Sequence, residues 1–428
     1  MDNNSGIETP DSLALRKREL FDAIDDGNFE AARPLIDAET AAATSNHGQT
    51  PLMRAAANGH RAIVEALLPF SDAKAKSDSG NTALILAARS NHVECVEALL
   101  PFSNPKNKDA EGNTALIIAA EQDALECVQA LIPDGRPRAA NHHGRTALMQ
   151  VVHHGSVETA EALLPVSDLT AVDSWGSTAM HWSADYGHVS MIELLAPHCD
   201  LTMPDDNGAT PLMLAAHSGA NVECLKALAD GSDFSAVDKD GRTALHRAAA
   251  SSKGPSIEGL RFLIDRSDSK AVDKSGMTAL MLAAEREHVA AVRELLPVSD
   301  ATAVNNYGRT ALGEAIKQCS AECADLIAPY SAPREAAKAL RKFEGQMPRL
   351  MAFKEAKVIE KAAAQGAKAA QRAEAAALKA AAKKGVAKAT ATVEADATIG
   401  ASQSQANAGP TQAPGAPAPA PQRRSMRL

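Results

Sequence analysis

The chain has 428 residues, enough for two or three ordinary domains, yet only 3% of them are aromatic, which argues against one large globular core. It contains no run of 18 apolar residues, and its first 20 residues lack the apolar segment of a signal peptide, so neither a membrane span nor secretion is expected. Six cysteines in this length are too sparse for a secreted disulfide scaffold. We therefore expect a cytoplasmic protein, with the nucleus as the alternative compartment.

The net charge of −9 conceals two regions of opposite charge. Residues 334–428 contain 17 lysine and arginine residues against 7 acidic ones, whereas residues 1–333 contain 27 against 46. The C-terminal region thus carries about +10 and the rest of the chain about −19. Such an asymmetry predicts two regions with different partners, or a basic tail that folds back onto the acidic body.

A short motif recurs along residues 19–333. Residues 1–18, which precede this region, are expected to be disordered. A glycine is followed two residues later by threonine in nine places, spaced 32 to 35 residues apart. The glycines are Gly48, Gly80, Gly112, Gly144, Gly176, Gly208, Gly241, Gly276 and Gly308. A period near 33 residues indicates a stacked helical repeat, and each repeat is named below by its glycine.

Each repeat is predicted to contain a turn followed by two helices. Asp or Asn stands three residues before the glycine in seven repeats, as Asp109 does before Gly112, which suits a turn whose glycine takes a positive φ. The threonine, Thr114 in this repeat, can cap the first helix, on which a small pair such as Ala119–Ala120 lets neighbouring helices approach closely. The second helix has a helical apolar period and ends at proline in seven repeats, as at Pro133.

This pattern, G-x-T-[AP]-L…A-A…G-H…V-x-x-L-L, resembles the ankyrin repeat. Two repeats also hold the histidine of the family's T-P-L-H motif, at His181 and His246. The resemblance implies an all-α fold, an α-solenoid of helix-turn-helix repeats joined by β-turn or hairpin loops. It covers residues 19–333, with a degenerate first repeat at 19–45. Departures are small: the connection between repeats is one residue shorter than is usual in the family, and residues 251–256 lengthen one interhelical turn.

Histidine and cysteine stand three residues apart at His92 and Cys95, a spacing that raises the question of a metal site or an activated thiol. The same position in four repeats holds Cys95, Cys127, Cys224 and Cys323. The ankyrin pattern takes an apolar residue there, and the histidine does not recur with the cysteine, because Asp123 and Ala124 precede Cys127. We therefore predict buried structural cysteines, with metal or thiol chemistry as the alternative.

We find no catalytic sequence motif in the array. The histidine-rich segment at 142–154 is not H-E-x-x-H and spans a turn and a helix, so zinc is only an alternative there. The glycines do not form a phosphate-binding loop, a dinucleotide fingerprint or a nucleophile elbow. We expect a protein that is not an enzyme and that needs no metal or cofactor.

The resemblance implies protein recognition through the turn tips and through the residues after the small pair. The chain has 2 tryptophans and 3 tyrosines, and three of these five residues occupy such positions. They are Trp175, Tyr186 and Tyr307. The repeat before Trp175 adds cationic side chains at Arg145, His142, His143, His153 and His154. Because Trp, Tyr and Arg dominate interface energetics, these eight are the predicted protein-binding residues, centred on the Gly144 and Gly176 repeats. The alternative is that the rings merely cover neighbouring apolar surface, and Trp182 is expected in the core.

Beyond Pro333 the repeat stops. Residues 334–393 are alanine-rich and basic and are predicted to be helical. Apolar residues at the start of this segment are expected to cap the last repeat, namely Leu340, Phe343, Met347, Leu350, Met351 and Phe353. Residues 394–428, rich in proline and alanine, are expected to be disordered.

The sequence therefore predicts a monomeric, non-catalytic scaffold or adaptor that binds a protein partner along the array. The alternative is a tether, in which residues 334–393 bind nucleic acid or another polyanionic surface while the array recruits a protein. A solvated helix without a partner is the other interpretation of the basic segment.

Overall fold

The computed structural model describes residues 10–219, 222–252, 254 and 256–343, together with residues 348, 352, 368, 371 and 372. The chain divides into two parts, Met1–Phe353 and Lys354–Leu428, and the array lies in the first. The predictions for residues 1–9 and 394–428, and for most of 344–393, lie outside the described residues.

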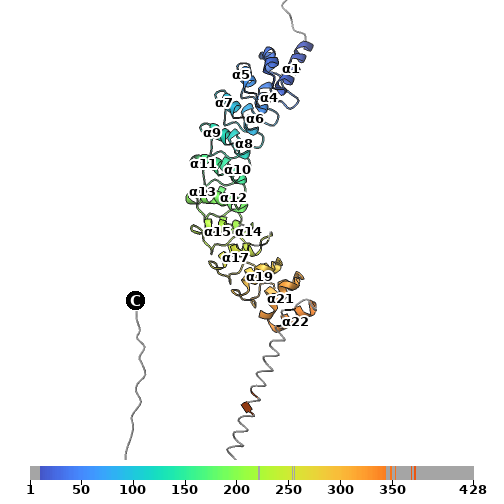
Figure 1. Cartoon of the computed structure of the whole chain (residues 1–428), viewed down its shortest axis with the longest axis vertical. Helices are drawn as coiled ribbons and strands as arrows, with labels where there is room; N and C mark the ends of the chain where they lie inside the picture. The colour runs from blue at the N-terminus through green and yellow to red at the C-terminus, as the bar shows by residue number, and fades with distance from the viewer. Residues whose placement is uncertain are drawn as a thin grey trace, which may run out of the picture. The chain divides into compact units, whose positions relative to one another are not determined.

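Nine helix pairs follow one another along the array, in the order shown by the colours of Figure 1. The first helices of the repeats are α4 (Pro51–Asn58), α6 (Ala83–Arg89), α8 (Ala115–Glu121), α10 (Ala147–His154), α12 (Ala179–Tyr186), α14 (Pro211–His217), α16 (Ala244–Ala249), α18 (Ala279–Glu285) and α20 (Ala311–Lys317). The second helices are α5 (Arg61–Leu67), α7 (Val93–Leu99), α9 (Leu125–Leu131), α11 (Val157–Leu163), α13 (Val189–Leu195), α15 (Val222–Ala229), α17 (Ile257–Ile264), α19 (Val289–Leu295) and α21 (Ala321–Ile327). Short 3-10 turns are η1 (Arg33–Leu35), η2 (Leu68–Phe70), η3 (Leu164–Val166), η4 (Ala196–His198) and η5 (Ala328–Tyr330).

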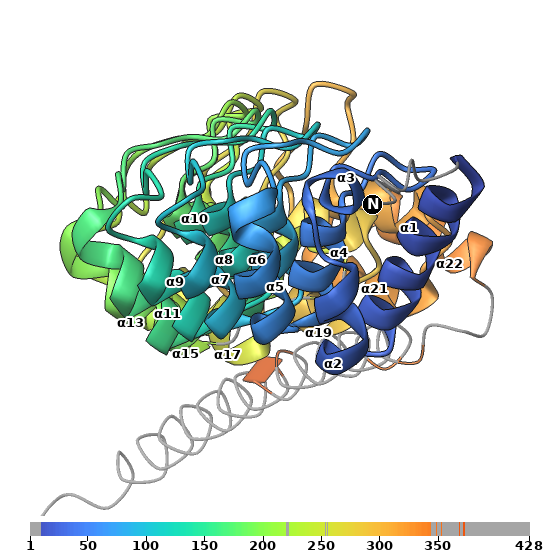
Figure 2. The same ribbon diagram turned by 90° about the horizontal axis from the view of Figure 1, so that it is seen from above.

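The helices form two layers. Each first helix packs against the first helices of its neighbours, as α8 does between α6 and α10, and the second helices pack in the same way in the other layer. Figure 2 shows the layers side by side, with the turns projecting together on one side of the molecule. Among the described residues the one β pairing outside helices is an isolated bridge between Ala140 and Thr146. The all-α solenoid predicted from the sequence is confirmed.

The turns are built as the sequence predicts. Asp109 Oδ1 accepts the backbone N–H groups of Glu111 and Asn113, at 3.0 and 2.8 Å. The side chain of Asp109 therefore closes the turn. Gly112 has φ +83°, and a Cβ there would lie 2.8 Å from the backbone nitrogen of His142 in the next turn. Only glycine fits this conformation and this approach without strain. The same approach lets His142 N–H donate to the carbonyl oxygen of Glu111, so adjacent turns are hydrogen-bonded to one another.

Threonine hydroxyls cap the first helices in eight of the nine repeats. Thr114 Oγ1, for example, accepts the N–H of Ile117 at 3.3 Å. Thr210 is the exception, because its side chain makes no capping hydrogen bond at the start of α14. The predicted capping role is therefore confirmed everywhere except in the Gly208 repeat.

Replacing Thr114 by alanine should lower the free energy of unfolding by about 1 kcal/mol, because the Ile117 N–H loses its acceptor. Thr210→Ala is the matched control and should cost less, since Thr210 makes no such bond. Guanidinium denaturation of the two variants measures the difference. Equal losses would show that the capping bond contributes nothing beyond the buried side-chain atoms.

The core runs continuously through both layers. The small pair Ala119–Ala120 is fully buried between adjacent first helices, as are the large side chains Leu116 and Ile117. The core consists of many small, closely packed side chains and not of aromatic rings, as the low aromatic content predicted. The stack therefore buries its apolar surface between neighbouring repeats.

The four equivalent cysteines are buried, as predicted. Burial raises the pKa of the Cys95, Cys127 and Cys224 thiols to about 11, so they remain protonated at neutral pH. His92 Nε2 lies 3.1 Å from the carbonyl oxygen of Ala57 in the preceding repeat and thus links two repeats. The described residues contain no cluster of three or more His, Cys, Asp or Glu side chains that could hold a metal ion.

The N-terminal end differs from the prediction. Helix α1 (Pro10–Asp25) includes residues 10–18, which were expected to be disordered. The helix packs against α4, Leu20 on it is fully buried, and Arg16 forms an ion pair with Asp37. These contacts with residues farther along the chain hold the segment in place. The first repeat is completed by α2 (Phe29–Ala32), η1 and α3 (Ala38–Ala41).

The C-terminal end of the array is capped by α22 (Pro333–Lys342), which packs against α20 and η5. Ala336, Ala339 and Phe343 are buried there, so Phe343 takes the capping position predicted for it. The predicted capping residues Met347, Leu350, Met351 and Phe353 lie outside the described residues.

Candidate protein-binding surface

Rings from two adjacent repeats form a continuous cluster on the surface of the array. Five residues define this aromatic patch: Arg145, His153, Trp175, Trp182 and Tyr186. Trp175 and Trp182 have ring centroids 6.3 Å apart, Trp182 and Tyr186 are 5.6 Å apart, and Tyr186 and His153 are 4.8 Å apart. Trp175 and Tyr186 are 51% and 41% exposed, so the patch presents large rings to solvent.

Two elements of the Gly176 repeat position these rings. Trp175 lies at the tip of the turn, where its N–H donates to Asp173 Oδ1 at 2.9 Å. Trp182 and Tyr186 are four residues apart on α12, and therefore lie on the same face of this helix. The turn and the first helix thus bring three aromatic side chains together.

Trp182 packs against the core but lies at its edge, whereas the prediction placed it inside the core. Its ring is half-buried and its Nε1–H donates to Asp173 Oδ2 at 2.9 Å. Arg247 has the equivalent position in the Gly241 repeat, where it donates to Asp238 in the same way. In the Gly112 and Gly276 repeats the same position holds Ile118 and Leu282, which are buried, so the sequence position alone does not decide whether the side chain faces the turn or the core.

Arg145 packs its guanidinium over both indoles. The Cζ atom lies 4.5 Å from the centroid of Trp182 and 5.4 Å from that of Trp175, which is cation–π geometry. The Nε atom is buried and has no hydrogen-bond partner. Within the part of the chain that the structure describes, no carboxylate oxygen lies within ion-pair distance of this arginine. The guanidinium of Arg145 is therefore stacked on the two indoles, but its charge is not neutralised by a carboxylate.

The histidines of the Gly144 repeat divide between the patch and other positions. His153 and His154, both exposed at the end of α10, have ring centroids 5.2 Å apart. Partial desolvation of the His153 ring, reinforced by the charges of His154 and Arg145, lowers its pKa from 6.5, so the neutral form is favoured at pH 7. His142 packs its ring over Gly112 in the preceding turn, and His143 is exposed at the turn tip.

Tyr307, the remaining predicted binding residue, is far along the array in the Gly308 repeat. It is 63% exposed, and the nearest cation is Arg309, whose Cζ lies 5.0 Å from its ring centroid. The structure thus brings Arg145, Trp175, Tyr186 and His153 together with His154, and it leaves Tyr307 apart from them.

A pocket of about 260 Å³ opens beside the aromatic patch, between the Gly176 and Gly208 repeats. Its lining residues are Arg145, Trp175, Ser177, His181, Trp182, Asp185, Tyr186, Asp205 and Leu214. His181 is fully buried, and its Nε2 lies 3.2 Å from the carbonyl oxygen of Ala209, so it links the two repeats instead of facing a ligand. The pocket has room for one side chain of a partner.

The family model for ankyrin repeats, described as "Ankyrin repeats (3 copies)", matches residues 16–77, 68–139, 135–205, 191–271 and 249–336. The chain belongs to the ankyrin repeat family. Ankyrin repeats are in general modules of protein–protein interaction, and the residues of the aromatic patch all lie within the matched ankyrin segments. No curated protein sequence shows significant similarity to the chain.

Solved ankyrin domains resemble the array. The ankyrin repeat domain of Bcl-3, described as a member of the IkappaB protein family, is 25% identical, with a TM-score of 0.45, over 49% of this chain and 97% of that domain. The human ASB11 ankyrin repeat domain is 23% identical, with a TM-score of 0.46, over 51% of this chain and 98% of that domain.

Among the described helices, none is long and apolar enough to cross a membrane.

Proposed function

We propose that this protein is a non-catalytic scaffold or adaptor that binds a protein partner at the aromatic patch. The supporting observation is the grouping of Trp175, Trp182 and Tyr186 around the unpaired guanidinium of Arg145. Such rings give a partner large contact area at low cost in side-chain entropy, and Trp, Tyr and Arg are the residues that carry most binding energy in interfaces.

The first experiment is affinity purification from the native cell with two baits, the full chain and residues 1–353, with and without nuclease. The shorter bait ends after α22, so that it keeps the cap on the last repeat. Proteins that both baits retain after nuclease treatment would support binding by the array.

The variant Arg145→Ala, Trp175→Ala, Tyr186→Ala should weaken binding of a partner identified in this way by about 2 kcal/mol or more, roughly 30-fold in Kd. The loss follows from removing two exposed rings and the cation stacked beside them. Isothermal titration calorimetry measures the change. Phe102→Ala, which removes an exposed ring that is not among the predicted binding residues, is the control and should leave the affinity unchanged. Unchanged affinity in the triple variant would place the interface elsewhere on the array.

The alternative is a tether, which the charge of the chain favours. Residues 334–428 hold 17 basic against 7 acidic residues, a composition suited to nucleic acid or another polyanion. Salt-dependent retention of the full chain on heparin or DNA, lost in residues 1–353, would support this function. Partners found only with the full chain and removed by nuclease would support it in place of the scaffold.

A further inference from the structure

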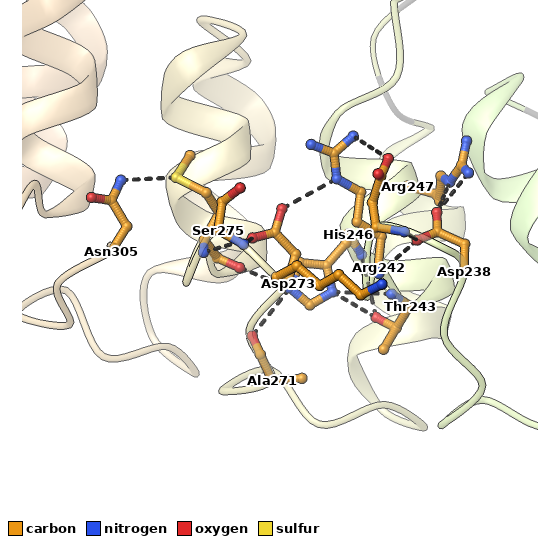
Figure 3. Close-up of polar contacts among 12 residues, drawn as sticks. Asp238, Arg242, Thr243, His246, Arg247, Ala271, Asp273, Ser275 and Asn305 are labelled. Atoms are coloured by element: carbon orange, nitrogen blue, oxygen red, sulfur yellow. Dashed lines mark hydrogen bonds and ion pairs between the residues drawn. The ribbon is translucent and has the colours of Figure 1, made fainter. Parts of the chain in front are cut away.

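Three arginines follow the turn glycine of their repeats, but only Arg145 differs in its surroundings. Arg242 donates through Nε to Asp273 Oδ2 at 3.2 Å, and Arg309 donates through Nε to Glu314 Oε1 at 2.7 Å. Figure 3 shows the first of these pairs. The Nε of Arg145, in contrast, is buried without an acceptor. The same fold therefore gives two of these arginines a carboxylate partner, whereas Arg145 has none among the described residues.

The two positions that supply a carboxylate in the other repeats do not supply one to Arg145. Asp173, the equivalent of Asp273, accepts the Nε1–H of Trp182 through Oδ2, and its Oδ1 accepts the N–H groups of Trp175 and Ser177. The position of Glu314, five residues after the arginine, is occupied in this repeat by Gln150, which carries no charge. Neither the Gly144 repeat nor the Gly176 repeat therefore supplies a carboxylate that pairs with Arg145.

The indoles hold the guanidinium in place. Its Cζ lies 4.5 Å from the ring centroid of Trp182 and 5.4 Å from that of Trp175, so the stacked rings restrict the guanidinium before any partner binds. Arginine presents paired N–H donors that match the two oxygens of a carboxylate, and less entropy is lost when the fork is already ordered. A carboxylate would therefore match the terminal nitrogen atoms of this guanidinium.

We propose that the partner presents an aspartate or glutamate whose carboxylate binds Arg145, while an adjacent apolar side chain enters the pocket beside Trp182 and Leu214. This inference rests on the proposed function, since it names the chemistry of the partner at the same patch. It also explains how an array of net negative charge selects its partner: acidic segments are repelled elsewhere and accepted here.

Other charged groups around the pocket set the sign of a decisive test. Asp205 lines the pocket, but its Oδ1 already accepts the N–H groups of Asn207 and Ala209. Asp185 also lines the pocket and is exposed. An acidic ligand on Arg145 is repelled by Asp185, so Asp185→Asn should strengthen its binding. A basic ligand would respond in the opposite direction to both Asp185→Asn and Arg145→Gln.

The test uses the full chain and an immobilised positional-scanning library of acetylated, amidated hexapeptides. The chain has 2 tryptophans, both in the aromatic patch, so intrinsic fluorescence of Trp175 and Trp182 reports binding there without a label. We expect selection of Asp or Glu at one position. The best peptide should bind Arg145→Gln about tenfold more weakly and Asp185→Asn several-fold more tightly.

Arg242→Gln is the matched control, because Arg242 already pairs with Asp273, and it should leave the selection unchanged. Selection of Lys or Arg, weakened by Asp185→Asn, would overturn the proposal in favour of a cationic ligand. Selection of an acidic residue that survives in Arg145→Gln would overturn the role of this arginine. Absence of any peptide that changes the tryptophan fluorescence, together with full partner binding by the Arg145→Ala, Trp175→Ala, Tyr186→Ala variant, would instead contradict the proposed function itself.

Discussion

Replacing Asp238 by alanine will lower the free energy of unfolding of the Gly241 repeat by about 3–5 kcal/mol, because it leaves a largely buried arginine without its partner. Asp238 Oδ2 accepts Arg247 Nε at 2.6 Å, and the exposed fractions of the two side chains are 0% and 19% (Figure 3). Its other oxygen accepts the N–H groups of Asp240 and Arg242, both at 2.8 Å. One side chain thus closes the turn and anchors α16 to it.

Asp238→Asn is the control that the molecule itself supplies. Asn141 and Asn305 occupy this position in two other repeats, and each accepts two backbone N–H groups through Oδ1 as Asp238 does. The asparagine variant keeps the turn but also leaves Arg247 without its carboxylate, so it should cost about 1–2 kcal/mol less than the alanine variant. Native-state hydrogen exchange of residues 238–250 measures both variants. Equal losses in the two would contradict the role assigned to Asp238 in closing the turn.

The repeats could be predicted in detail because their determinants are local. Asp109, Gly112 and Thr114 lie within six residues of one another, and their hydrogen bonds and backbone angles depend little on the rest of the chain. The position of Trp182 could not be predicted in this way. Its surroundings come from three repeats, with Arg145 on the preceding one and Leu214 on the following one. Contacts between repeats, and not local pattern, decide whether such a ring is buried.

The candidate site shows the same division. The exposure of Trp175 and Tyr186 was predictable, because turn tips and the ends of first helices face solvent in most repeats. The unpaired state of Arg145 was not, because it depends on which group Asp173 binds. The start of α1 at Pro10 was also missed, since the ion pair between Arg16 and Asp37 joins segments that no local pattern connects. The chemistry of the patch thus emerges only when adjacent repeats are stacked.

Acidification will destabilise the array through two buried histidines, His181 and His246. The Nδ1 of each accepts the N–H of its capping threonine, Thr178 or Thr243, and the Nε2 faces backbone carbonyl oxygens of the next repeat. This pattern fits the neutral ring with its proton on Nε2. Protonation of Nδ1 would break the bond to threonine.

Burial lowers the pKa of both rings from 6.5, against smaller opposing effects of Asp205 on His181 and of Asp273 on His246. The unfolded chain therefore binds protons at these sites as the pH falls through about 6.5, whereas the folded chain does not until its lower pKa is reached. The stability that the two neutral histidines contribute is complete above about pH 6.5, and it is lost as the pH falls from there through the lower pKa of the folded chain. Each histidine can reduce the free energy of unfolding by up to about 1.4 kcal/mol per pH unit within this window.

Methionine occupies the equivalent position in other repeats, at Met149, Met213 and Met281, and is buried in each. The double variant His181→Met, His246→Met therefore suits the fold and removes both titrating rings. Guanidinium denaturation between pH 5.5 and pH 7.5 should show a shallower loss of stability on acidification in this variant than in the natural chain. An identical slope in both proteins would mean that other groups, such as His153 and His217, whose pKa values burial also lowers, control the acid response. A shallower slope would show that the histidines of the T-P-L-H motif make the stacking of the array sensitive to pH.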